Sequence, residues 1–242
     1  MAVINSLTLR LLFARSSGDT NVSLSCFAYL YSELVQYHQN RVDSISELER
    51  RLESSGYGVG LKVLELLAYR SREVRTKRFL KVKQLSSDWH LKKEISSSHR
   101  CLPSFLQYKR EIRLMNILQF VSTQVWKGLF NKPADSLERS IDHADEFMIV
   151  DYDPLTSTFC SVPSDFGQLS VDAYMSGIIA GVLSGAGFSA RVTAHSVQLE
   201  EGETAPTSYT APNTSLPPRR EKAVFLVKFS PEVLERDASM ER

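Results

Sequence analysis

The sequence predicts an α+β domain in which a layer of helices is followed by a small antiparallel sheet. Three observations support this fold class. Residues 112–130 carry apolar side chains at helical spacing, the chain before them shows helical patterns, and most of the chain after them reads as strands. With 242 residues, 43% of them hydrophobic, the chain is long enough to bury one sizeable core.

The central helix of this scheme spans residues 112–130. Its apolar side chains recur every three or four positions and form one broad band: Leu114, Met115, Leu118, Val121, Val125, Trp126 and Leu129. Pro133 follows directly, and a proline cannot continue a helix. We therefore expect a long helix with a wide buried side, which separates the helical part of the domain from the sheet.

The first helix is predicted over residues 21–39, with Ser23 or Asn21 as its N-cap. Its apolar arc covers roughly 200° of the helical wheel, which is wider than packing on one core requires. Either one part of this arc meets a partner chain, or the helix is buried on two sides within its own domain. The wheel alone favours neither interpretation.

Two more helices are predicted before the central one. Ser44 and Glu47 form a capping box that opens a helix ending at Gly56, where glycine is a common C-cap. Another helix runs from Val59 to about Arg72. The short connections make these helices neighbours in space.

After the central helix the sequence predicts a short helix at 135–142, then a hairpin with strands at 147–150 and 158–162 around a turn ending in Pro154. A helix at 171–185 follows. It has Ala or Gly at every fourth position, and we expect this bare side to pack closely on the hairpin. Strands at 188–197 and 223–229 complete a four-stranded sheet.

Two stretches interrupt the pattern, and we interpret both as low-order insertions in one domain spanning 21–237. The first, at about 73–110, lies in a basic stretch: residues 70–113 hold thirteen Lys and Arg against four Asp and Glu. A solvated loop is a better explanation of this charge than a phosphate or anionic-membrane site. The second, at 199–222, is rich in Pro, Ser and Thr.

The two ends of the chain are predicted to be tails. Residues 1–20 are interpreted as a disordered basic tail, with an organelle presequence as the alternative, and residues 238–242 as a second tail.

The chain lacks the motifs that usually carry chemistry. Its three cysteines are odd in number and far apart, which favours a reducing compartment over a disulfide framework. Nucleotide loops, nucleophile elbows and paired zinc ligands are all missing. We therefore expect no catalytic, cofactor or metal site, and no transmembrane segment. An enzyme built on Cys160 or His195 remains a minor hypothesis, because catalytic partners can be distant in sequence.

Several strings along the chain resemble one protein family. They cover about 21–71, 111–198 and 222–237 and comprise Val22-Ser23-Leu24, Phe27-Ala28, Ser32 to Gln36, Glu47 to Leu52, Gly56-Tyr57, Val59-Gly60, Val63 to Leu67, Phe120-Val121, Val125-Trp126-Lys127, Leu129-Phe130, Lys132, Ala134 to Glu138, Ser161-Val162-Pro163, Gly177-Ile178, Gly187-Phe188 and Val192 to His195. Together they resemble the small core subunits of the transport protein particle (TRAPP), of the Bet-three type.

The resemblance implies an α/β-plait fold, with helices on one side of a four-stranded antiparallel sheet. It also implies a non-catalytic scaffold that binds sister subunits in a vesicle-tethering complex. That complex acts at Golgi and ER–Golgi membranes, on their cytoplasmic side, and promotes nucleotide exchange on a Rab GTPase. No nucleic acid is expected as a partner.

Family members pair through their first helices, which fits the wide apolar arc of residues 24–37. The predicted partner face is therefore Leu24, Phe27, Tyr31 and Leu34. The sequence departs from the family pattern at the two insertions, and no acylated cysteine of the family has a clear match here. A small-ligand or acyl-chain-binding module, with its pocket between helices and sheet, is the alternative function.

Overall fold

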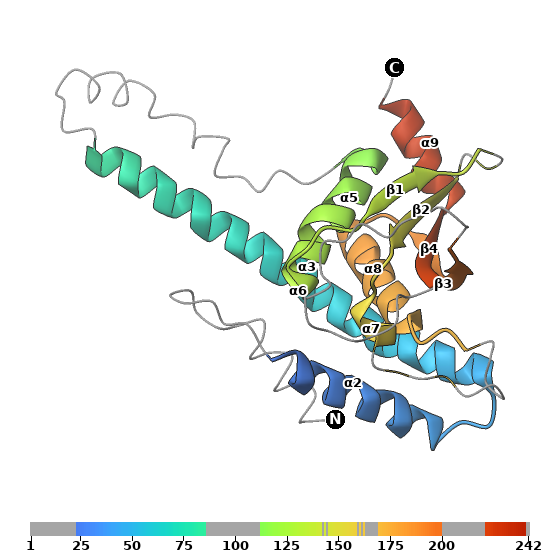
Figure 1. Cartoon of the computed structure of the whole chain (residues 1–242). Coiled ribbons are helices and arrows are strands. Elements are labelled where there is room, and N and C mark those ends of the chain that lie inside the picture. Colours follow the sequence, from blue (N-terminus) through green and yellow to red (C-terminus); the bar gives the residue numbers. More distant parts are fainter. Residues whose placement is uncertain are drawn as a thin grey trace.

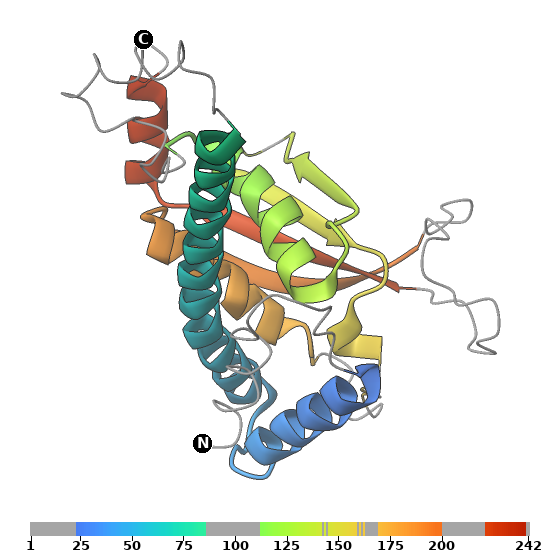
Figure 2. The ribbon, with the colours of Figure 1, turned by 90° about the vertical axis from the view of Figure 1, so that its left-hand side faces the viewer.

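The domain has two layers, a group of helices and a four-stranded antiparallel sheet (Figure 1). The computed structural model describes residues 23–85, 112–141, 143, 145–158, 160, 162, 169–199 and 221–240, with only the backbone path for 71–85. Figure 2 shows α3, α5 and α8 on one face of the sheet. This arrangement confirms the predicted α+β class, with helices on one side of four antiparallel strands.

The elements follow one another as α2 (Leu24–Gln39), α3 (Ile45–Leu85), α5 (Leu114–Phe120), the π-helical segment η2 (Val121–Val125), α6 (Trp126–Phe130), β1 (Ser136–Arg139), β2 (Glu146–Asp151), α7 (Leu155–Thr158), α8 (Ala173–Ala186), β3 (Ala190–Gln198), β4 (Glu221–Phe229) and α9 (Pro231–Ser239). The helix α9 has no counterpart among the predicted elements.

A single helix, α3, replaces the two helices predicted at 44–56 and 59–72. The capping box is present, with the backbone N–H of Glu47 donating to Ser44 Oγ at 3.3 Å, but the helix does not end at Gly56. It runs for 41 residues, about 60 Å at 1.5 Å per residue. Its second half projects from the body of the domain (Figure 1). The helix continues past Arg72, where the second predicted helix ends, into the stretch predicted as an insertion at 73–110. Residues 86–110 lie outside the described part.

The glycines of α3 fail to break it because they serve another purpose. The backbone of α3 at Gly56 and Gly60 lies directly against that of α8 at Tyr174, Ile178 and Gly181. Each helix brings two glycines to this crossing, so the two backbones touch without intervening side chains. The bare side of α8 therefore packs on α3. The prediction that it packs on a hairpin was wrong. This close packing compensates for the helix stability that each glycine costs, about 1 kcal/mol relative to alanine.

The predicted central helix is present as three continuous segments, from Leu114 to Phe130. Its middle is π-helical, and the carbonyl of Ser122 there accepts a hydrogen bond from the N–H of Ala134 at 2.8 Å. The helix ends at Asn131, whose φ of 60° lies in the left-handed region. The chain can then turn back toward the sheet just before Pro133.

The sheet has the strand order β1-β2-β4-β3, and every neighbouring pair is antiparallel. The strands predicted at 147–150, 188–197 and 223–229 are present as β2, β3 and β4, within two residues of the predicted bounds. The helix predicted at 135–142 is instead the strand β1. Its Leu137 faces Ile149 and packs against the core, and this tertiary pairing overrides the helical preference of Leu, Glu and Arg.

The strand predicted at 158–162 is also absent from the described residues. Both edges of β2 are already occupied, by β1 and β4, so a third strand has no free edge to pair with. The chain forms the short helix α7 after Pro154 instead. The prediction of four strands was therefore right in number and wrong in the identity of one.

The main core lies between the sheet and the helices. Buried residues on alternate positions of β4 point into it, and they meet the wide face of the central helix and the apolar side of α8: Ala223, Phe225, Val227 and Phe229. Trp126 is completely buried and packs edge-on against Phe225, with ring centroids 5.6 Å apart. The predicted buried face of the central helix is thus confirmed for most of its residues, whereas Met115 is 51% exposed.

The two predicted tails and the second predicted insertion fall largely outside the described residues. Residues 1–22, 200–220 and 241–242 lie outside the described part, and so does most of the insertion at 199–222. None of the described helices is both long and apolar enough to span a membrane.

Candidate partner-binding face

The helix α2 is joined to the rest of the domain along one side only. Tyr31 and Leu34 are buried there and pack with Val171, just before α8. Phe27 stacks on Tyr31 with ring centroids 5.9 Å apart, and Tyr174 of α8 meets the other side of the Tyr31 ring. The N-terminus is capped by Ser23, whose Oγ accepts from the N–H of Cys26 at 3.3 Å.

A buried tyrosine hydroxyl fixes the helix to the loop before α8. Tyr31 donates from Oη to the carbonyl oxygen of Val171 at 2.7 Å. Burial, reinforced by the nearby Asp172, Cys160 and Tyr174, raises the pKa of Tyr31 well above its usual range. Burial also raises the pKa of Tyr174 to about 12. Folding therefore favours the neutral phenol of both tyrosines.

We expect Tyr31→Phe to lower the free energy of unfolding at pH 7 by about 1 kcal/mol, the net contribution of one buried hydrogen bond. A raised folded-state pKa contributes stability that is present below pH 10 and is lost as pH rises above it. Denaturant unfolding at pH 7 and pH 11 should show that the free energy of unfolding falls less with pH in the variant than in the unmodified chain. The fall that remains in the variant comes from Tyr174. Tyr29→Phe, at a position 79% exposed, is the control and should change neither value.

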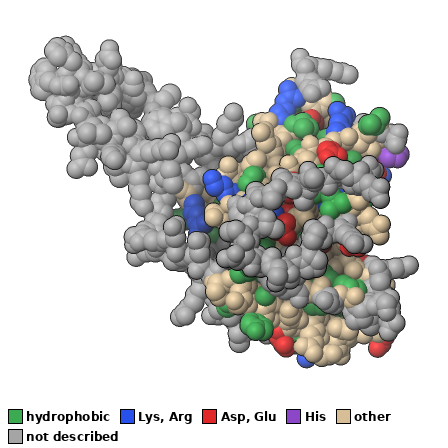
Figure 3. Space-filling model, in the orientation of Figure 1, with side chains coloured by type: hydrophobic (Ala, Val, Ile, Leu, Met, Phe, Trp, Pro, Cys, Tyr) green, Lys and Arg blue, Asp and Glu red, His purple; other side chains and the backbone are tan. Residues whose placement is uncertain are grey.

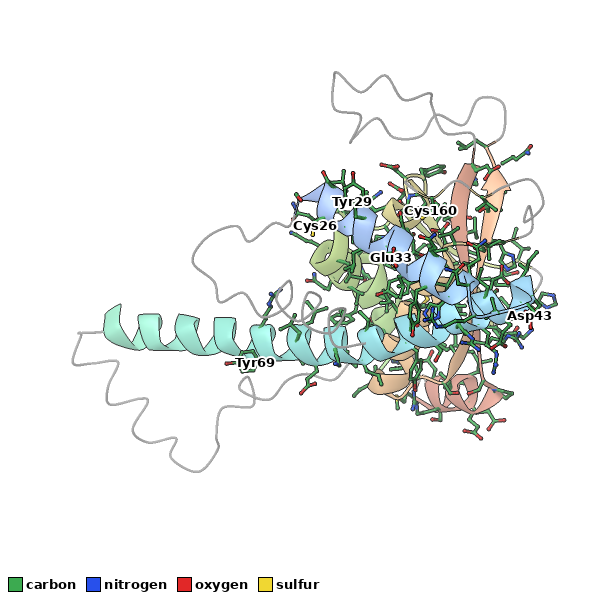
Figure 4. The ribbon with its side chains drawn as sticks, turned by 90° about the horizontal axis from the view of Figure 1, so that it is seen from below. Cys26, Tyr29, Glu33, Asp43, Tyr69 and Cys160 are labelled. Carbon is green, nitrogen blue, oxygen red and sulfur yellow. The ribbon has the colours of Figure 1, made fainter. Side chains whose placement is uncertain are left out.

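The helix α2 also carries apolar side chains that the domain does not cover. Leu24 is 50% exposed, Tyr29 79% and Tyr37 40%. Figure 4 looks at α2 with the rest of the domain behind it and shows Cys26, Tyr29 and Glu33 along this helix. Over α2, at the bottom of Figure 3, hydrophobic side chains lie among polar and acidic ones. Tyr29 and Tyr37 lie on the side of the helix away from Tyr31, and Leu24 is exposed in the first turn. We call these three residues together the outer face of α2.

The structure divides the predicted partner face in two. Tyr31 and Leu34 face the domain itself, Phe27 is half-buried beside Tyr31, and Leu24 is exposed in the first turn of the helix. Tyr29 lies outside the predicted apolar arc, so the wheel gave no reason to choose it. Among the described residues, α2 is buried on one side only, which contradicts the interpretation that it is buried on two sides. The binding of a partner to α2 stays a prediction.

The C-terminal end of α2 is fixed to α3 by polar contacts. His38 Nε2 lies 3.1 Å from Ser55 Oγ, and Arg41 donates to the carbonyl of Tyr37 at 2.8 Å while its guanidinium covers the Tyr37 ring. Burial, together with the charges of Arg51 and Arg41, lowers the pKa of His38. This histidine is therefore a neutral structural contact at pH 7.

A second polar cluster is buried under the turn after β2. Asp151 accepts from Lys132 Nζ at 2.7 Å and from Trp126 Nε1 at 3.0 Å, and Lys132 also donates to the carbonyl of Asp153 at 2.9 Å. Lys132 and Asp151 are both buried. Burial raises the pKa of the neighbouring Asp135, and the charge of Asp151 adds to this effect. The sequence predicts only a turn ending in Pro154 here, and no local pattern indicates the partners of Asp151.

The residues proposed for a minor enzymatic hypothesis lie apart. Cys160 packs beside Tyr31 and Leu34, where burial raises the pKa of its thiol, so the reactive thiolate is disfavoured. His195 lies on β3, exposed, and contacts Thr193 Oγ1 at 2.9 Å. Among the described residues, no group of three His, Cys, Asp or Glu side chains is arranged to hold a metal ion. The alternative of a ligand pocket between helices and sheet stays a prediction.

Comparison with known proteins gives a consistent result. The family model described as transport protein particle (TRAPP) component matches residues 27–229. The chain is 37% identical over 223 residues to trafficking protein particle complex subunit 5 of Dictyostelium discoideum, covering 92% of this chain and 93% of that protein. It is 38% identical over 176 residues to the human subunit 5, covering 73% and 76%.

The chain is also similar, at lower sequence identity, to a yeast subunit and to a solved structure. Subunit 31 of the same complex from Saccharomyces cerevisiae is 27% identical over 254 residues, covering 94% of this chain and 81% of that protein. Among solved structures, subunit 3 from Naegleria fowleri, covalently bound to palmitic acid, superposes with a TM-score of 0.53 at 14% identity and covers 86% and 95% of the two chains. At that identity the likeness concerns the fold alone.

Proposed function

Because the chain belongs to the TRAPP component family, we propose that it is a structural subunit of the TRAPP vesicle-tethering complex and binds sister subunits through the outer face of α2. The observation that carries this proposal is the uncovered apolar side of a helix whose other side is well anchored. Tyr29, 79% exposed, belongs to the class of aromatic residues that dominate protein interfaces.

The proposed role is structural. In ER-to-Golgi and Golgi trafficking, the subunit supports assembly of a complex that catalyses nucleotide exchange on a Rab GTPase. It reaches the cytoplasmic side of these membranes through the complex. The family relationship and the exposed helix face support this role, and the separation of Cys160 from His195 weighs against a catalytic one.

The first test is co-expression with a Bet-three-type sister subunit, followed by size-exclusion chromatography with light scattering. We expect a one-to-one complex. Leu24→Glu combined with Tyr29→Glu should weaken it at least about tenfold, because two interface anchors of about 1 kcal/mol or more are lost and charges are buried in their place. Both positions are exposed, so the variant should stay folded.

The matched control is Ile141→Glu, the same chemical change at a fully exposed apolar residue between β1 and β2. It should bind as the unmodified chain does. A chain that elutes alone as a folded monomer beside its sister subunit would overturn the proposed function. Equal binding by all variants would move the interface away from α2. Leu34→Glu would be no test of the interface, because Leu34 is buried in the chain itself.

A further inference from the structure

The two edges of the sheet differ in how they are protected. One edge is β1, which has only four residues and ends in the exposed pair Glu138 and Arg139. Short length and charge are usual means of preventing further strand pairing. The other edge is β3, nine residues long, which pairs with β4 along its whole length without a bulge and contains neither proline nor lysine. This edge lacks the usual safeguards.

The backbone groups that β3 presents outward follow from its register. The N–H of Ser230 donates to the carbonyl of Ser189 at 3.0 Å, one step before the first strand pair. Backbone groups alternate along an antiparallel strand, so those of Thr193, His195 and Val197 face β4. Those of Ala194, Ser196 and Gln198 face away from it. Within the described residues, β3 has backbone hydrogen bonds to β4 alone.

The second half of β3 is also open to an approaching chain. His195, Ser196, Val197 and Gln198 are all exposed, although side chains of successive residues point to opposite faces of the sheet. In Figure 2, the ends of β3 and β4 farthest from α9 reach beyond the helices. A strand placed along this half of β3 would meet neither the helical layer nor β4.

The charges of the edge indicate what kind of strand fits it. Its ionisable side chains are Arg191 and His195, both exposed, and it carries no acid. Arg191 also acts on α3, where burial raises the pKa of Glu53 and the arginine partly offsets this. Lys228, opposite Arg191, is held by Asp145 and Glu146. Opposite charges across a strand pair stabilise it and like charges destabilise it, so an acidic strand fits better than a basic one.

We propose that β3 is the acceptor for an added strand, supplied by an extended segment of a sister subunit of the complex. The segment forms hydrogen bonds with the outward groups of Ala194, Ser196 and Gln198, places an acidic side chain near Arg191 or His195, and covers Val197 with an uncharged one. This contact rests on the proposed function and adds a second interface, separate from the outer face of α2.

The first measurement is hydrogen–deuterium exchange in the isolated chain and in the complex purified with the TRAPP core subunits. We expect the outward amides of Ala194, Ser196 and Gln198 to exchange quickly in the isolated chain. In the complex their exchange should be slower by a factor of up to about ten, as a new backbone hydrogen bond would cause. The inward amides of β3 should change little. A complex that forms while these outward amides stay fast overturns the added strand and leaves the proposed function standing.

The second measurement uses Ser196→Pro, which removes only an outward N–H, because proline is tolerated at the solvent side of an edge strand. We expect the variant to keep its thermal midpoint and to bind the complex roughly tenfold more weakly, whereas Ser196→Ala binds normally. Unchanged binding by Ser196→Pro overturns the proposal even if the amides are protected. Failure of the unmodified chain to join any complex overturns the proposed function as well.

Discussion

Gly60→Ala is expected to lower the free energy of unfolding by about 3 kcal/mol, the upper end of what overpacking a well-packed site costs. A Cβ on Gly60 would lie within 3.0 Å of the carbonyl oxygen of Ile178 in α8. That atom belongs to the backbone of a buried helix, so it cannot move aside as a flexible side chain can. The two helices must separate, and the core beneath them opens.

The same helix supplies the control for this prediction. A Cβ on Gly58, two residues earlier, would meet no atom within 4 Å. Gly58→Ala should therefore raise the free energy of unfolding by about 0.5–1 kcal/mol, because alanine is the better helix former. Urea unfolding followed by circular dichroism measures both values. Two variants of similar stability would show that the backbones of α3 and α8 are not in direct contact.

Asp151→Ala is expected to cost about 3–5 kcal/mol, the usual penalty when one partner of a buried ion pair is removed. Lys132 would remain in the interior without its carboxylate, and Trp126 would lose the acceptor of its indole N–H. The carbonyl of Asp153 alone cannot replace both contacts. This loss is a large share of the 5–15 kcal/mol that stabilises a typical domain.

The comparison for this variant is an ion pair of similar length at the surface. Glu47 lies 2.7 Å from Arg50 and 3.1 Å from Arg51 on the exposed side of α3. Glu47→Ala should change the urea midpoint little, because water screens such pairs. If the two alanine variants lose the same stability, the Lys132–Asp151 pair does not have the buried environment described above. The double variant Lys132→Met, Asp151→Leu should recover part of the loss, since it leaves no charge buried.

Local patterns in the sequence were sufficient for elements whose neighbours agree with them. The central helix and β4 follow their own periodicity, and each buries most of the side that its pattern indicates. The strand β3 does so only in its first half, at Val192. The predictions failed where a distant contact decides the structure. Gly56 has the residue type of a helix end, and only the position of α8 shows why the helix continues through it. Residues 136–139 favour a helix in isolation, and only the free edge of β2 makes them a strand.

Two of the four residues predicted for the partner face, Tyr31 and Leu34, lie within the apolar arc, and the domain buries them itself. Tyr29 is exposed and lies outside that arc, so a wheel ranks it low. The partner face itself stays a prediction. The ion pair of Lys132 and Asp151 was missed for a similar reason, since no local pattern links a lysine after a helix with an aspartate after a strand.

The strand order has a consequence for synthesis of the protein. The strand between β2 and β3, β4, is the last of the four strands to be made. Its Val227 pairs with both Phe147 of β2 and Val192 of β3. Until that residue leaves the ribosome, β2 and β3 have no strand between them, and the apolar faces of the central helix and α8 lack half of their core. At about 5–20 residues per second, synthesis from the end of β3 at Gln198 to the end of β4 at Phe229 takes about 2–6 s, and during this time the sheet cannot close. A chain truncated before residue 221 should remain unable to form the complete sheet. We expect chaperones to bind it and proteases to degrade it.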